Sequence, residues 1–144
     1  MASFIYNEAK RMLFAGELDL NADDMRLKML MTNTTADTEN DGIVNLSDFT
    51  TLDEMDGANY AVKALTTETV SKDDANDRAE FDCDDITYTS LGAGTRGVAG
   101  FLLYKYVDGT PGNDIAVAWI EQAATPDGSN FTIQINAEGL LQLT

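Results

Sequence analysis

The chain has 144 residues, of which 44% are hydrophobic and 8% aromatic, enough for one domain with a substantial core. Its 25 acidic and nine basic residues give a formal net charge of −16, which argues against nucleic acid and anionic membranes as partners. It contains no histidine, the commonest general base and metal ligand, and one cysteine, Cys83, which we expect to be a semi-buried side chain. No apolar run approaches the ~20 residues of a membrane span, and the opening residues do not resemble a signal peptide, so we expect a protein made in a cytoplasm.

The N-terminal third predicts one short helix and one strand. Residues 7–14 suit one or two helical turns, with Asn7 as the N-cap and Gly16 ending the helix. The run 25–31 alternates Met and Leu with Arg and Lys, the period of a half-buried strand. Residues 32–59 are polar and rich in turn formers, so we expect them to be irregular.

The rest of the chain predicts short strands separated by turns. The acidic stretch 71–77, the run 108–113 and the pair Asp127-Gly128 are turn signals, and Trp119 is expected in the core. The expected strands are 60–70, 78–81, 86–90, 98–107, 115–121, 131–136 and 140–143. With 25–31 this makes about eight short antiparallel strands, which predicts a single-domain β-sandwich or small barrel over residues 1–144.

One acidic stretch matches the spacing of a calcium-binding loop. In residues 37–48 an EF-hand loop would use oxygen ligands at its positions 1, 3, 5, 9 and 12, with Gly42 at the sharp turn. The candidate ligands are Asp37, Glu39, Asp41, Asn45 and Asp48. Glu at position 3, the short Asp at position 12 and the lack of a preceding helix favour a solvated acidic loop, with no metal bound.

Residues 92–97 match the G-x-G-x-x-G pattern of dinucleotide-binding proteins. In those proteins the glycines follow a strand and open a helix whose N-terminus holds the pyrophosphate. Here the following residues, 98–107, have the pattern of a strand, so we expect a glycine-rich hairpin and no cofactor.

Three carboxylates lie close together at Asp82, Asp84 and Asp85 and could in principle serve acid–base catalysis. Close carboxylates are common in so acidic a chain, and Asp favours turns and caps. We therefore expect these residues to be solvated or to cap turns, and we expect no enzymatic activity.

One pattern of strand and turn residues extends over nearly the whole chain. Its parts are 4–10, Gly16 with 18–20, the strand 25–31, Glu54 with Gly57 and Tyr60, Leu65 with the strand after it, 76–88, 127–133 and 139–143. This pattern resembles a family of small proteins encoded among the structural genes of tailed phages. The chain departs from the family at Cys83, where a small apolar residue is usual, and in its more acidic 37–48 loop.

The resemblance implies a non-enzymatic virion protein of the cement or decoration type. Such proteins sit on the capsid surface, often at threefold positions, and bridge neighbouring subunits of the major capsid protein. Self-association on the capsid, for instance as a trimer, is also implied. We expect the N-terminal arm, residues 1 to about 16, to make contacts between subunits. Alternatives are a tail, head-fibre or adaptor component of the virion, or a calcium- or carbohydrate-binding module.

Overall fold

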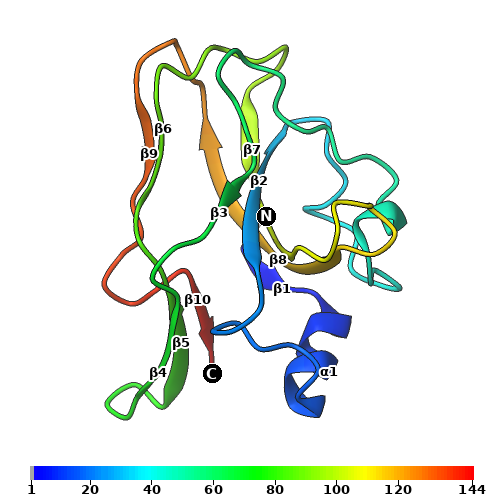
Figure 1. Cartoon of the computed structure of the whole chain (residues 1–144), viewed down its shortest axis with the longest axis vertical. Coiled ribbons are helices and arrows are strands. Elements are labelled where there is room, and N and C mark those ends of the chain that lie inside the picture. Colours follow the sequence, from blue (N-terminus) through cyan, green and yellow to red (C-terminus); the bar gives the residue numbers. More distant parts are fainter. Residues whose placement is uncertain (1) are drawn as a thin grey trace.

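The computed structural model describes residues 2–144, which fold into a mostly β domain (Figure 1). These residues form ten strands and one α-helix. The elements are β1 Phe4–Ile5, α1 Asn7–Ala15, β2 Met25–Met31, β3 Lys63–Ala64, β4 Thr69–Asp73, β5 Arg78–Asp82, β6 Ile86–Tyr88, β7 Val98–Lys105, β8 Ile115–Ala124, β9 Phe131–Ile133 and β10 Leu141–Leu143. All strand pairs are antiparallel, and the sheets formed by these residues stay open, so the prediction of a β-sandwich-like domain is confirmed and a barrel is not formed.

The central layer is a five-stranded sheet with the order β1-β8-β7-β2-β3. Strand β2 has the predicted bounds, and Leu27 and Met29 are fully buried on one face. Trp119 of β8 is 1% exposed, as expected of a core residue. Its ring lies against Gly100 of β7, where no side chain would fit beside it.

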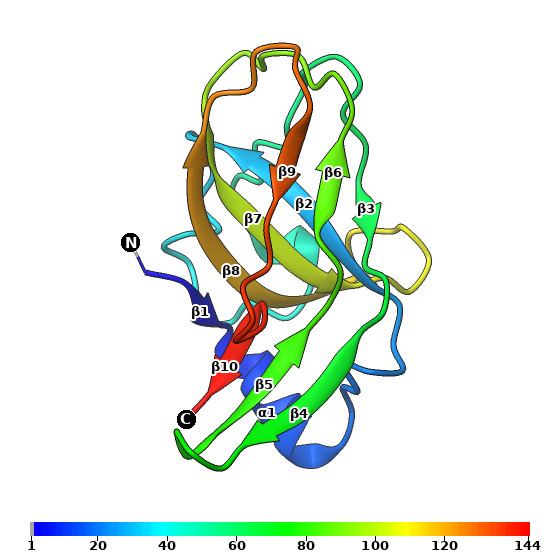
Figure 2. The same ribbon diagram turned by 90° about the vertical axis from the view of Figure 1, so that its left-hand side faces the viewer.

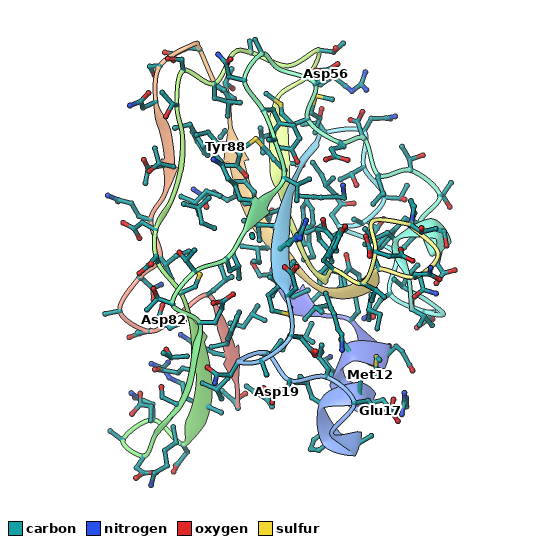
Figure 3. All side chains as sticks on the ribbon, viewed as in Figure 1. Met12, Glu17, Asp19, Asp56, Asp82 and Tyr88 are labelled. Carbon is teal, nitrogen blue, oxygen red and sulfur yellow. The ribbon has the colours of Figure 1, made fainter. Side chains whose placement is uncertain are left out.

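Two smaller sheets lie on one side of this layer. The pair β6-β9 lies over the upper part, and the three-stranded sheet β10-β5-β4 continues downward beyond it (Figure 2). Phe101 of β7 stacks on Phe131 of β9, with ring centroids 6.5 Å apart. Tyr88 of β6 points into the space between the central sheet and the β6-β9 pair (Figure 3) and stacks on Tyr60. Aromatic rings therefore form part of the contact between the two layers, together with Ile86 and Ile133.

The irregular region 32–59 covers the opposite face, as Figure 1 shows on the right. It contains one short 3₁₀ helix, Leu46–Asp48. Tyr6 connects this region to the N-terminus, because its hydroxyl donates a 2.7 Å hydrogen bond to the Ala36 carbonyl and its ring packs edge-on against Phe49. Burial raises the pKa of the Tyr6 hydroxyl, so it remains a donor.

The helix α1 ends where the sequence predicts but begins differently. Gly16 adopts the left-handed conformation, with φ 71°, and closes the last turn. The N-cap is Tyr6, so the prediction of Asn7 at this position is wrong. The first helical amide, that of Asn7, instead donates to Oδ1 of Asn40 at 2.8 Å, so a residue distant in sequence satisfies the helix terminus.

The strands differ from the prediction at three places. The strand expected over 60–70 is two strands, β3 and β4, which belong to different sheets, and Thr67 between them has a positive φ of 58°. Strand β4 extends through Asp73 into the stretch expected to be a turn. The two-residue strand β1 is not predicted, because two residues carry no periodic signal.

Candidate docking groove

The calcium-loop candidates are only partly brought together. Glu39, Asp41 and Asp48 line a hollow of about 340 Å³, which Asp37 and Asn45 do not line. Within residues 2–144, no group of three or more His, Cys, Asp or Glu side chains is arranged to hold a metal ion.

Two of these carboxylates already have partners. Glu39 accepts hydrogen bonds from Thr35 and Thr50, which lower its pKa, Thr50 contributing most. Asp48 accepts the amides of Val44 and Asn45 at 2.9 and 2.7 Å and so caps the 3₁₀ helix. Glu39 and Asp48 therefore use carboxylate oxygens to hold the loop itself.

The glycine-rich segment 92–97 precedes strand β7, as expected, and no helix follows it. It connects β6 to β7, which lie in different sheets, so the expectation of a hairpin is wrong. Asp56 accepts hydrogen bonds from the amide and hydroxyl of Thr95, and Arg96 pairs with Asp53. These contacts fix the segment against the 32–59 region.

The carboxylates of the 82–85 cluster cap backbone and hydroxyl groups. Asp82 accepts the amide of Cys83 at 2.9 Å, Asp84 accepts the hydroxyls of Thr66 and Thr67, and Asp85 accepts the amide of Ile135 at 2.8 Å. Burial foremost, with Asp82 nearby, raises the pKa of the Cys83 thiol to about 12. The thiol is therefore protonated and unreactive near neutral pH.

An apolar groove lies between the three-stranded sheet and the segment that follows α1. Its volume is about 380 Å³. Among its lining residues, Ile5, Leu18 and Leu20 are buried on the side of the N-terminal segment. Figure 3 shows Asp19 on this segment, between α1 and the sheet β10-β5-β4. The lining residues are Ile5, Leu13, Gly16, Leu18, Asp19, Leu20, Asn21, Val70, Ala79, Glu80, Phe81, Leu141, Gln142 and Leu143.

Strand register explains why this side of the small sheet is apolar. Val70, Phe81 and Leu141 stand directly opposite one another on β4, β5 and β10 and so share a face. Phe81 at the centre is only 2% exposed, whereas Val70 at the β4 edge is 55% exposed and Leu143 on β10 is 41% exposed. The apolar row is therefore covered at its centre and open toward solvent at β4 and at the end of β10.

The groove walls are acidic. The three segments that form them, 7–24, 69–82 and 138–144, carry eleven acidic and four basic residues, a net charge of −7. Three of the basic side chains are in ion pairs: Arg11 with Glu8 and Glu17, Lys72 with Asp74, and Arg78 with Asp73, Glu80 and Glu138. Asp23 and Asp24 are paired with Lys105 and Arg26, which lie outside these segments, so the negative charge around the apolar surface is partly compensated.

Sequence patterns alone did not indicate this groove. Its residues come from three segments far apart in the chain, and the sequence places them on separate elements without relating them. The one local pattern that points to it is the alternation Leu141-Gln142-Leu143, which places both leucines on one face of the last strand, where they would pack against other apolar residues.

Comparison with known proteins adds no family to this description. No protein-family model, no curated protein and no solved structure matches the chain. Among residues 2–144, no helix has the length and apolar character needed to cross a membrane.

Proposed function

We propose that this chain is a non-enzymatic structural protein of a tailed-phage virion that decorates the outer surface of the capsid. The observation that carries the proposal is the open apolar groove on an otherwise strongly acidic β domain. An apolar surface left open beside a buried core favours contact with another protein. The sequence resemblance to small phage structural proteins indicates the major capsid protein as that partner.

The scaffold suits a protein that must be present in many copies. A net charge of −16 keeps separate copies apart and soluble at high concentration. Each contact with the shell can then be small, because repeated contacts around a symmetric particle add through avidity. Self-association at a threefold position, for instance as a trimer, belongs to the same proposal.

The carboxylate clusters support a structural role. The acidic residues at 82–85, and Glu39 and Asp48 in the 37–48 loop, accept hydrogen bonds that fix turns, strand ends and the 3₁₀ helix. Carboxylates used in this way stabilise loops that would otherwise be mobile. Rigid loops are what a protein needs to present a constant surface to a shell.

The proposal is tested with particles assembled without the chain. Purified particles from a gene deletion are mixed with the recombinant protein and sedimented, and the bound fraction is measured against concentration. Saturable binding at a fixed number of copies per capsid subunit is the expected result. Binding confined to the tail or to a single vertex would favour a tail, head-fibre or adaptor role, and no binding to any part of the particle would refute the proposal.

A further inference from the structure

We infer that the groove takes an extended, basic segment of the partner protein, which adds as a fourth strand to β4 and places its apolar side chains beside Val70. This inference rests on the proposed function, because it names the chemistry of the surface that the groove would recognise.

The sheet order leaves β4 open to such a strand. In the order β10-β5-β4, strand β4 pairs with β5 on one side only. An edge strand offers unpaired backbone groups on its other side, and peptides that add to such edges gain main-chain hydrogen bonds. Strand β4 has five residues and contains no proline, so its backbone can pair along its length.

The side chains on β4 define the pattern of the incoming strand. Val70 and Lys72 lie on the groove face, whereas Thr69, Ser71 and Asp73 lie on the other. A residue opposite Val70 would extend the row Val70–Phe81–Leu141 and cover the most exposed part of it. Every second side chain of the incoming segment should therefore be apolar.

Charge complementarity determines the remaining positions. The walls carry a net charge of −7, and Asp19 lines the groove, whereas Glu80 stands opposite Ser71, on the other face of the sheet, and pairs with Arg78. Lysine or arginine next to the apolar residues of the incoming segment would meet this negative field. A second copy of a chain with a net charge of −16 would bring like charges together, so the electrostatics favour a basic partner over self-association at this face.

The first experiment compares two substitutions on the same strand with the same change of charge. Val70→Lys faces the groove, and Ser71→Lys faces away from it; both positions are exposed, so both variants should fold with unchanged melting temperatures. We expect Val70→Lys to weaken binding to chain-free particles at least tenfold and Ser71→Lys to change it less than twofold. Equal effects of the two substitutions would overturn the inference while leaving the capsid proposal intact.

The second experiment is independent of capsids. The ¹⁵N-labelled protein is titrated with the peptide Ac-KVKVKVK-NH₂ and, as the control, Ac-EVEVEVE-NH₂, while amide shifts are followed by NMR. Shifts confined to β4, β5, β10 and residues 16–21 with the basic peptide, weakened by Val70→Lys and by high salt, are expected. The substitution Asp19→Asn should also weaken binding, although it keeps an oxygen that can accept the Asn21 amide.

The outcomes separate this inference from the proposed function. Peptide binding in the groove by a protein that does not bind particles would refute the capsid proposal and leave the groove specificity standing. Equal binding of both peptides, or none, would overturn the inference. Sedimentation velocity tests whether a second copy of the chain fills the groove. A wild-type oligomer that Val70→Lys dissociates would show that it does, and would overturn the inference of a basic partner segment.

Discussion

Replacing Gly100 with alanine tests how closely the core is packed around Trp119. A Cβ at this position would lie 2.6 and 2.7 Å from two ring carbons of Trp119 and would also press on the backbone carbonyl of Ile120. Trp119 is buried and stands opposite Phe4 in β1, the strand that leads into α1. Relieving the overlap therefore requires β8 or the Trp119 ring to move.

The expected cost is that of an overpacked core, about 1–3 kcal/mol of unfolding free energy. For a domain of this size, that lowers the melting temperature by roughly 3–10 °C. Gly97→Ala is the matched control, because its nearest neighbours, the Ala124 carbonyl and the Thr125 hydroxyl, would lie at 3.6 and 4.0 Å. Both variants are compared with the wild type by calorimetry and urea unfolding. Equal stability of the two variants would refute this account of the packing.

Three further predictions concern the N-terminus and the acidic loop. Tyr6→Phe leaves the Ala36 carbonyl without its donor and should lower the unfolding free energy in urea by about 1–3 kcal/mol; an unchanged midpoint would contradict the burial of this bond. Hydrogen bonds, those of Thr50 foremost, hold the pKa of Glu39 below its ordinary 4.5, so its contribution to stability is present above that pH and is lost as the pH falls through the folded value. In Glu39→Gln the unfolding free energy should accordingly fall less steeply as the pH is lowered. The same pH dependence in both proteins would contradict this role of Glu39. Calcium at about 1 mM should leave the melting temperature unchanged; a rise would revive the 37–48 loop as a calcium site.

Local sequence signals predicted the elements that depend on local physics. The period of β2 follows from one face packed in the core, and a residue with positive φ, Gly16, ends α1. The break between β3 and β4 is different, because Leu65 donates its amide to Met25 while β4 pairs with β5. Tertiary pairing decides which sheet each half joins, and no local pattern records it.

The groove could not be predicted for the same reason. Ile5, Phe81 and Leu141 are each ordinary apolar residues of short strands, and only the fold brings them together. The N-terminal arm shows the converse: it was expected to reach other subunits, but β1 pairs with β8 of its own chain. Contacts between subunits remain a prediction for the outer surface of this arm, where Phe14 is 89% exposed. The substitution Phe14→Ser tests them better than deletion of the arm, because a deletion would also remove Tyr6 from the core.

The copy number of the chain in purified particles tests the central proposal most directly. Quantitative mass spectrometry would compare the chain with the major capsid protein of the same particles. A ratio near one to one, or a simple fraction such as one to two, is the predicted result, because a decoration protein occupies repeated sites on the shell. A handful of copies per particle would move the chain to the tail or a vertex, and its absence from particles would contradict the virion proposal altogether.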